Sequence, residues 1–259
     1  MHSDIGVVYL RKLAIPETGL PASDTGKGIW QSLMGEYYEA CLKPIISQAA
    51  FPINNYSAAT QNNKYETLLA AKSFGLAIPE TIITNTKKTL LDFLADRNYS
   101  SVITKPADEL CSFNQGEHLY KTFTKKISAD EVAALPERFF PSLFQQAISN
   151  VTDIKTVYCF GRFFTAACLQ TADKKTDFRS NYAHVKTLPY KLPDEIEKRL
   201  DRLLRHLGLS ICTVDFILSD DGTLYFLEIN PFGQFGSISL SCNYFIERFI
   251  AEKFTQYAN

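Results

Sequence analysis

The sequence predicts an α+β protein in which mostly antiparallel sheets carry helices on their faces. Three observations lead to this fold class. Two pairs of apolar runs, each pair split by a short turn that contains glycine, predict β-hairpins within 156–169 and 211–229. Between them, 193–206 begins with a proline and has aliphatic residues at helical spacing, which predicts an amphipathic helix whose apolar side covers a sheet.

Local signals place the remaining elements. Gly75 and Gly208 follow periodic segments and are typical helix stops, and Ser128 with Glu131 has the spacing of a capping box. We expect helices at 29–48, 64–74, 87–96, from Ser128, at 193–206 and at 242–254. We expect strands at 5–10, 76–84, 101–105, 119–123, 144–148, 156–160, 163–169, 211–218 and 223–229. The polar stretches 16–28, 51–63 and 171–187 are expected to form turns, a linker and a loop.

The composition excludes several classes of protein. The 259 residues are 46% hydrophobic and 21% charged, with a formal net charge of -1, which indicates neither a disordered chain nor a strongly basic nucleic-acid binder. No apolar run approaches the ~18 residues of a membrane span, and the N-terminus lacks a signal-peptide pattern. Cys159 and Cys168 lie in apolar runs and are expected to be buried thiols in a reducing, cytoplasmic setting.

The stretch from Thr213 to Gly236 carries the most informative pattern. If Asp221-Gly222 forms a two-residue type I′ turn, Asp215 and Glu228 are equally far from the turn and face each other. Asn230 shares the face of Glu228. Facing carboxylates repel unless a cation lies between them, and oxygen ligands without sulfur or imidazole favour magnesium. The alternative, an ordinary polar face of an exposed hairpin, is disfavoured by the apolar neighbours of these residues.

The run DFIL…GTLYFLEINPFGQ resembles the final strands of the ATP-grasp ligases. This resemblance implies an ATP-grasp fold, in which two α+β subdomains grip ATP. It also implies that Asp215, Glu228 and Asn230 hold Mg²⁺ that bridges the ATP phosphates.

Other stretches resemble the same family in the same order. Lys64 resembles the lysine that opens the central domain, which implies that it binds the nucleotide. Lys105 in VITKP resembles the strand-end lysine that contacts the α- and β-phosphates. The run FQQAI resembles the interdomain hinge whose backbone reads the adenine edge. The nucleotide-binding residues implied there are Gln145, Gln146, Ala147 and Ile148.

Two polar segments are implied to act near the reacting groups. TDIK resembles the D-I-R segment of the family, which implies a nucleotide-binding role for Asp153 and a catalytic role for Lys155. DFRSN is also found in the ribosomal-protein glutamate ligase branch, where its arginine faces the transferring phosphate, and this implies a catalytic Arg179. The alternative for Arg179 is a solvated loop charge. For His184, a solvated loop histidine is favoured over a base that deprotonates the nucleophile.

The end of the chain, PFGQFGSISLSCNYFIERFIAEKF, is similar to the ATP-grasp enzymes of grasp-with-spasm systems, which are relatives of the microviridin ligases and mature graspetides. The resemblance includes the opening VVYLRKL. It implies a partial, shortened N-terminal domain and linker at 1–60, a central subdomain at 61–144 and a C-terminal subdomain with the magnesium site at 145–259. Because only one strand precedes 16–28, we expect the helix at 29–48 to expose apolar surface or to be covered in a homodimer.

The function implied is that of an ATP-dependent ligase that activates Asp or Glu side chains as acyl phosphates and joins them to Ser, Thr or Lys. Its partner would be a ribosomal precursor peptide made of leader and core, with no nucleic-acid or membrane partner. The leader is expected to dock within Thr86–Ser142, where the basic run Lys121–Lys126 either meets an acidic leader or keeps a strand edge soluble. Two alternatives remain: a ligase that adds amino acids to a protein tail, and a non-catalytic protein that binds a precursor peptide.

Overall fold

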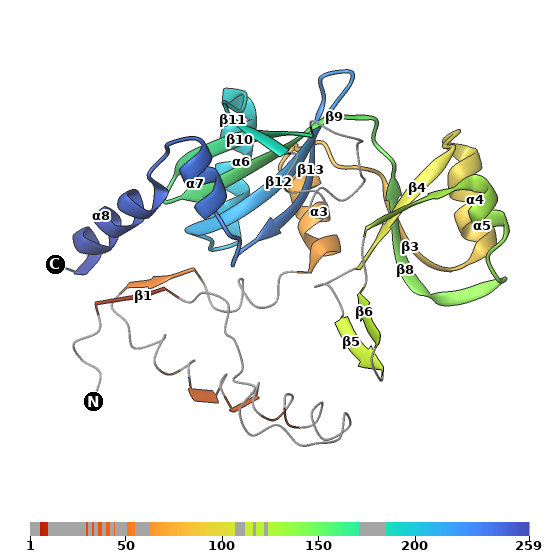
Figure 1. The fold of residues 1–259 in the computed structure, drawn as a ribbon, viewed down its shortest axis with the longest axis horizontal. Helices are drawn as coiled ribbons and strands as arrows, with labels where there is room; N and C mark the ends of the chain where they lie inside the picture. The colour runs from red at the N-terminus through yellow and green to blue at the C-terminus, as the bar shows by residue number, and fades with distance from the viewer. Residues whose placement is uncertain are drawn as a thin grey trace.

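Two antiparallel sheets, each covered by helices, dominate the described part of the chain (Figure 1). The computed structural model describes residues 6–9, 51–54, 63–106, 112–115, 118–121, 124–170 and 185–258, with seven positions between 30 and 44. The α+β fold class predicted from the sequence is confirmed. No helix in these ranges is both long and apolar enough to cross a lipid bilayer.

The larger sheet contains β9 (Asn150–Cys159), β10 (Arg162–Gln170), β11 (Val185–Tyr190), β12 (Ile211–Ser219) and β13 (Leu224–Asn230). The strand order is β11-β10-β9-β12-β13, and every neighbouring pair is antiparallel. The predicted β9–β10 hairpin forms, but its turn is Phe160-Gly161 instead of Gly161-Arg162. Cys159 pairs with Arg162, and Phe160 and Gly161 have φ values of 48° and 84°, as a type I′ turn requires.

Four helices flank this sheet: α3 (Lys64–Ser73), α6 (Asp194–His206), α7 (Gly236–Ser241) and α8 (Ile246–Ala258). Leu68 of α3 and Leu203 of α6 share a core with Phe216 on one face of the sheet. Ile238 of α7 and Ile246 of α8 belong to a second core on the other face. The side chains of the central strands therefore alternate between two apolar layers, and the larger sheet is buried on both faces over much of its area.

The smaller sheet contains β3 (Thr81–Thr86), β4 (Ser101–Lys105), β7 (Lys125–Ser128) and β8 (Arg138–Gln146), in the order β3-β8-β4-β7. Two helices, α4 (Lys87–Asp96) and α5 (Ala129–Ala133), pack on one of its faces (Figure 1). A separate ribbon is formed by β5 (Ser112–Gln115) and β6 (His118–Lys121).

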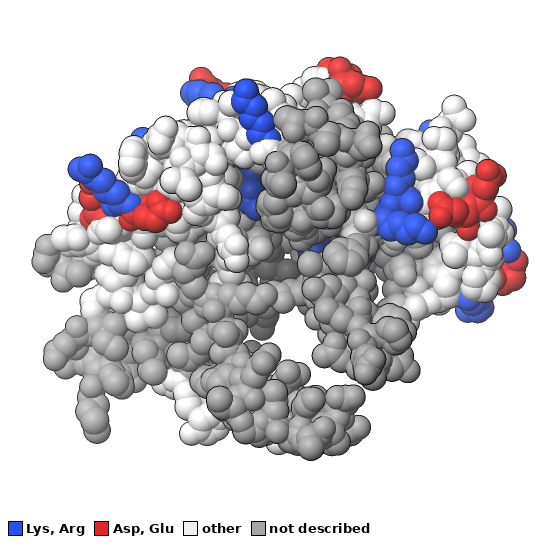
Figure 2. Space-filling model, viewed as in Figure 1, with Lys and Arg blue, Asp and Glu red and all other residues white. Residues whose placement is uncertain are grey.

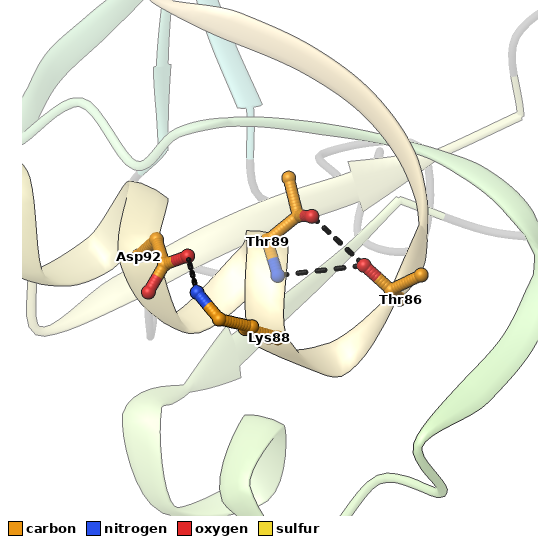
Figure 3. Close-up of polar contacts among 4 residues, drawn as sticks. All are labelled: Thr86, Lys88, Thr89 and Asp92. Carbon is orange, nitrogen blue, oxygen red and sulfur yellow. Dashed lines mark hydrogen bonds and ion pairs between the residues drawn. The ribbon is translucent and has the colours of Figure 1, made fainter.

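Side-chain caps fix where both helices of the smaller unit begin. Thr86 precedes α4, and its hydroxyl accepts the N–H of Thr89 at 3.4 Å, while Lys88 pairs with Asp92 at 2.8 Å one turn further on (Figure 3). The capping box predicted for Ser128 and Glu131 is confirmed, because each side chain accepts the backbone N–H of the other residue.

Two segments differ from the sequence prediction where the chain passes between the sheets. The strand expected at 76–84 begins only at Thr81, because the preceding residues run along β13, where Ala77 bridges Tyr225 and its carbonyl accepts the N–H of Phe226 at 2.8 Å. The short strand expected at 144–148 is the end of the nine-residue β8. Helix α3 lies in the predicted central subdomain, yet it contacts β13 of the larger sheet. The subdomain boundaries stay a prediction.

The closing helix expected at 242–254 starts only at Ile246, and a separate helix that was not expected, α7, ends at Ser241 just before the predicted range. Asn243 and Phe245 have positive φ values of 53° and 52°, which interrupt the helix, and the hydroxyl of Ser239 accepts the N–H of Ile246 at 3.0 Å where α8 starts. Strands β5, β7 and β11 were not expected, and β11 occupies the end of the stretch predicted as a loop at 171–187.

A parallel pair of short strands, β1 (Val7–Tyr9) and β2 (Phe51–Ile53), packs against α8. The ring of Phe51 stacks on that of Tyr257 with centroids 3.8 Å apart. The segment predicted as a linker at 51–63 thus begins with a strand. The described positions between 30 and 44 are helical, and Leu33 and Tyr37 are 60% and 65% exposed, which agrees with the exposed apolar side chains expected there. A second protomer on this helix stays a prediction, and 16–28 lies outside the described residues.

Asn54 ties the N-terminal strand pair to the start of β12. Its side chain is 5% exposed, its Nδ2 donates to the carbonyl of Ile211 at 2.8 Å, and its Oδ1 accepts the N–H groups of Ser210 and Ile211 at 2.8 and 2.9 Å. Its φ of 64° lies in the left-handed region, which asparagine tolerates better than most residues. One buried amide thus satisfies three backbone groups of a strand that carries candidate site residues.

Charged groups on the described surface are mixed in sign. In the view of Figure 2, several Lys and Arg side chains lie beside Asp or Glu side chains. Two surface pairs, Lys191–Asp194 and Arg248–Glu252, have nitrogen–oxygen distances of 2.8 and 2.9 Å. This mixing agrees with the near-zero net charge of the whole chain.

Candidate nucleotide and metal site

The predicted carboxylate pair lies on the β12–β13 hairpin. Asp215 faces Glu228 across the two strands, as the sequence predicts. Ile211 and Val157 lie at alternate positions of the same strands that carry Asp215 and Lys155, and both are buried in the core under α7 and α8. The carboxylate pair therefore lies on the same face of the sheet as this apolar core, further along the strands.

The pairing arises through a turn that differs from the predicted one. The turn has three residues, Asp220 to Gly222, because the N–H of Ser219 donates to the carbonyl of Thr223 at 3.0 Å and Gly222 has a φ of 83°. A longer turn alone would shift the pairing by one residue. A β-bulge beside Asp215 leaves Leu227 without a partner and restores the register.

Asn230, the third predicted metal ligand, ends β13 opposite Thr213. Its Oδ1 accepts the N–H of Phe232 at 2.9 Å, and its carbonyl accepts the N–H of Gly233 at 3.1 Å, so a turn follows the strand directly. A Cβ at Gly233 would lie 1.8 Å from the hydroxyl oxygen of Thr213, so only glycine fits there. The second lone pair of the Asn230 amide oxygen could still accept a cation.

Each carboxylate of the pair has its own lysine. Lys64 Nζ lies 3.5 Å from Glu228 Oε2, and Lys155 Nζ lies 3.9 Å from Asp215 Oδ1. Lys155 and Asp215 are also direct partners in the β9–β12 register. The four side chains are 23–28% exposed, so the cluster is open to water and to a ligand.

Lys105 approaches the same cluster from the other sheet. It is the last residue of β4. Burial lowers its pKa, the negative charges of Glu228 and Asp215 oppose that shift, and the positive charge of Lys64 adds to it. These interactions place the Lys105 ammonium in the electrostatic field of the carboxylate pair. A partly buried ammonium whose charge is incompletely balanced favours an added anion such as phosphate.

The predicted hinge residues lie where the smaller sheet joins the larger one. Gln145 is 3% exposed and its Nε2 donates to the hydroxyl of Thr81 at 2.9 Å, while the N–H of Gln146 donates to the carbonyl of Glu80 at 2.8 Å. Because β8 ends at Gln146 and β9 begins at Asn150, Ala147 and Ile148 lie in the connection. Their contact with adenine stays a prediction.

Asp153 lies on β9, two residues before Lys155 and therefore on the same face of the sheet. Its partner in the neighbouring strand is Cys168, which is 6% exposed. Burial, with a further contribution from Asp153, raises the pKa of the Cys168 thiol to about 11. The expectation that Cys159 and Cys168 are buried is confirmed, and both thiols are protonated near neutral pH.

The donor set fits magnesium better than a transition metal. Within the ranges that the structure describes, no three His, Cys, Asp or Glu side chains gather to hold a metal ion. Asp215, Glu228 and Asn230 supply only hard oxygen donors, two of them charged, and such sites hold Mg²⁺ when substrate phosphates and water complete the octahedron.

Two predicted participants, Arg179 and His184, lie outside the described residues. So do residues 107–111 after Lys105. The family resemblance implied nucleotide-binding roles for Lys64 and Lys105 and a catalytic role for Lys155. It did not indicate the ion pairs that Lys64 and Lys155 make with Glu228 and Asp215. If the pairing of β9 with β12 had been predicted, the strand register would have indicated the Lys155–Asp215 pair.

No protein-family model matches the chain. A curated relative, the uncharacterized protein MJ0776 of Methanocaldococcus jannaschii, is 26% identical over 185 residues, which are 70% of this chain and 44% of the relative. The chain thus matches less than half the length of that relative.

Solved structures cover more of the chain. Macrocyclase MdnC from Microcystis aeruginosa, bound with precursor peptide MdnA, is 24% identical with a TM-score of 0.81 over 96% of this chain and 78% of that one. A RiPP-associated ATP-grasp ligase from Chryseobacterium gregarium, in complex with ADP and a leader and core peptide, is 23% identical with a TM-score of 0.77 over 90% and 71%. ATP-grasp ligase PsnB, complexed with minimal precursor, Mg and ADP, is 19% identical with a TM-score of 0.73 over 98% and 78%.

These similarities define the class of fold. The chain has the ATP-grasp fold, as the resemblance of its last strands implied. The lysine and carboxylate cluster draws side chains from both sheets: Lys105 from the smaller sheet, and Asp215, Glu228 and Lys155 from the larger.

Proposed function

We propose that the chain is an ATP-dependent ligase that activates Asp or Glu side chains of a ribosomal precursor peptide and joins them to hydroxyl or amine groups, forming ω-ester or ω-amide crosslinks. The observation that carries this proposal is the Asp215–Glu228 pair with Lys64 and Lys155 beside it and Lys105 facing it from the other sheet. Such a cluster binds a divalent cation and several phosphate charges together.

The similar solved structures support the peptide as partner. MdnC is bound with a precursor peptide, the Chryseobacterium gregarium ligase with ADP, leader and core, and PsnB with a minimal precursor, Mg and ADP. By analogy, the partner proposed for this chain is a peptide with leader and core, its nucleotide is ATP and its metal is Mg²⁺. We also propose that the nucleotide lies between the halves 61–144 and 145–259.

The proposed chemistry proceeds in two displacements. A carboxylate oxygen of the peptide attacks the γ-phosphorus, the bond to the β,γ-bridging oxygen breaks, and ADP leaves. A hydroxyl or amine of the peptide then attacks the acyl carbon, loses its proton and expels phosphate. Nothing is oxidised or reduced, and each crosslink costs one ATP and removes the equivalent of one water from the peptide.

The chain's own residues hold charge in place during these steps. Asp215, Glu228 and Asn230 would hold Mg²⁺, which supplies charge neutralisation at the phosphates when bound. Lys105 binds phosphate oxygens from the smaller sheet, and its burial strengthens that attraction. Lys155, on β9, would lie beside the transferring phosphoryl group, and Asp153 on the same strand would contact the nucleotide. The segment from Gln145 to Ile148 would hold the base, and Arg179 would bind the acyl phosphate.

Nucleotide binding tests the proposal first. With magnesium and ATP, the wild-type protein should show a raised melting temperature, and Lys105→Ala should lose that rise because the phosphates lose a partly buried cation. Asp215→Asn should lower magnesium-dependent turnover by about a hundredfold or more, and Asp220→Asn, at the turn outside the cluster, should leave it nearly unchanged. A nucleotide-induced shift that survives Lys105→Ala would overturn the site.

Co-expression with the short open reading frames that flank the gene tests the substrate class. Intact mass should show one of these peptides lighter by a whole number of waters, and the change should disappear in Asp215→Asn and in Arg179→Ala. A peptide or protein that gains amino-acid residues instead would indicate the tail-adding ligase. Binding of a peptide without nucleotide turnover would indicate the non-catalytic alternative.

A further inference from the structure

Each carboxylate of the Asp215–Glu228 pair has a lysine ammonium group beside it. Lys64 and Lys155 lie 3.5 and 3.9 Å from the oxygens of Glu228 and Asp215, with exposed fractions of 23% and 25% for the two lysines. Adjacent carboxylates repel each other, and two ammonium groups offset that repulsion. Each ammonium thus lies beside a carboxylate that a bound cation would use.

Both lysines are fixed to the same structural unit as the carboxylates. Lys155 lies within β9, which pairs with β12 along most of its length. Lys64 begins α3, whose start is fixed by Asn63, since the Oδ1 of that residue accepts the N–H of Tyr65 at 2.8 Å. Helix α3 is anchored by Leu68, which is fully buried in the core of the larger sheet. Movement of the two sheets relative to each other therefore leaves these two ion pairs in place.

We propose that Lys64 and Lys155 act as counter-ions that couple metal binding to nucleotide binding. This inference rests on the proposed function of the site. A cation that binds between Asp215 and Glu228 weakens the attraction of these carboxylates for the two ammonium groups. The positive charges of Lys64 and Lys155 are then no longer balanced within a partly buried cluster. Nucleotide phosphates give both lysines new partners.

The consequence is a defined order of affinities. Metal alone binds weakly because it competes with two ammonium groups, and it binds more tightly once phosphates have drawn them away. The coupling is reciprocal, so metal also tightens nucleotide binding by the same factor. Because both distances lie at the long end of the ion-pair range, each pair contributes little stability and exchanges partners readily.

Manganese binding to the full chain tests this inference without any turnover. Free Mn²⁺ is measured by its electron paramagnetic resonance signal, first without nucleotide and then with a non-hydrolysable ATP analogue. Lys64→Met and Lys155→Met should each tighten Mn²⁺ binding without nucleotide by about three- to tenfold. The ratio of the two dissociation constants, without and with the analogue, should fall by at least the same factor. Lys64→Arg keeps the charge and should retain the wild-type values.

Lys87→Met is the matched control. Lys87 is 21% exposed and pairs with Glu137 at 2.6 Å in the smaller unit, so it has similar burial and an ion pair of its own. Its loss should leave Mn²⁺ binding unchanged. The inference is overturned if Lys64→Met and Lys155→Met leave metal affinity without nucleotide unchanged or weaken it. If the wild-type protein binds no Mn²⁺ even with the analogue, the proposed metal site itself fails.

Discussion

Replacement of Gly233 by alanine should distort the turn that follows Asn230. The added Cβ would lie 1.8 Å from Thr213 Oγ1, 2.5 Å from its Cγ2 and 2.6 Å from its Cβ. Rotation of the Thr213 side chain cannot relieve the last contact, so backbone must move. Overpacking of this kind costs about 1–3 kcal/mol, which for a chain of this size lowers the melting temperature by roughly 2–12 °C. Because the displaced turn donates its N–H groups to the carbonyl and side-chain oxygens of Asn230, magnesium-dependent turnover should fall as well.

Differential scanning calorimetry and a coupled ADP assay measure both effects, and Gly236→Ala is the matched control. Apart from its chain neighbours and the backbone of its own helix, nothing lies within 4 Å of a Cβ built at Gly236, so alanine there should leave the melting temperature unchanged or raise it slightly. Thr213→Gly in the Gly233→Ala background should restore part of the turnover by removing the obstructing side chain. If Gly233→Ala behaves like Gly236→Ala in both assays, the close approach to Thr213 does not constrain the site.

Further predictions concern the buried polar groups. Asn54→Ala leaves two backbone N–H groups and the Ile211 carbonyl without their partner, so the free energy of unfolding from urea titration should fall by about 2–4 kcal/mol, whereas Asn54→Asp, which keeps the acceptor, should lose less. The Cys168 pKa of about 11 exceeds that of an ordinary thiol, so the thiol ionises at a lower pH in the unfolded state than in the folded state. The protonated thiol therefore contributes stability that is complete below pH ~8.5 and is lost as the pH rises toward 11. Cys168→Ala should therefore lose less stability than wild type between about pH 8 and pH 10. Exposed Cys41 should react with a thiol reagent in the native protein, and Cys168 only after unfolding. An equal loss of stability with pH in both proteins, or rapid native labelling of Cys168, would contradict the burial argument.

The sequence was sufficient to predict the carboxylate pair, although one step in the reasoning was wrong. Alternating apolar residues and the Asp-Gly turn predicted a hairpin in which Asp215 faces Glu228, and the structure has that pair. The real turn is one residue longer, and the bulge at Leu227 compensates for it. The alternation of apolar residues indicates neither the length of a turn nor the position of a bulge. The sequence therefore could not show that the bulge would offset the longer turn and keep Asp215 opposite Glu228.

Other parts of the site depend on contacts between distant segments. The Lys64–Glu228 pair joins residues that are far apart in sequence, and it exists only because α3 packs against β13, which no local pattern predicts. The break between α7 and α8 was missed for a different reason. Asn243 and Phe245 adopt positive φ values, and a phenylalanine there gives no sequence signal, unlike a glycine. Arg179 remains a prediction from sequence alone.

The hydrogen bonds of Asn54 also bear on the order in which the chain can fold. Its partners lie 156 and 157 residues further along, and the rings that contact Phe51 and Tyr9 come from α8, later still. On a ribosome, β1 and β2 would emerge long before the segments against which they pack. Contacts of such sequence separation form slowly, because a long loop must close before they yield any stabilisation. The smaller sheet, whose strands all lie within 81–146, can form meanwhile, so the N-terminal strand pair is expected to join last and to complete the larger unit.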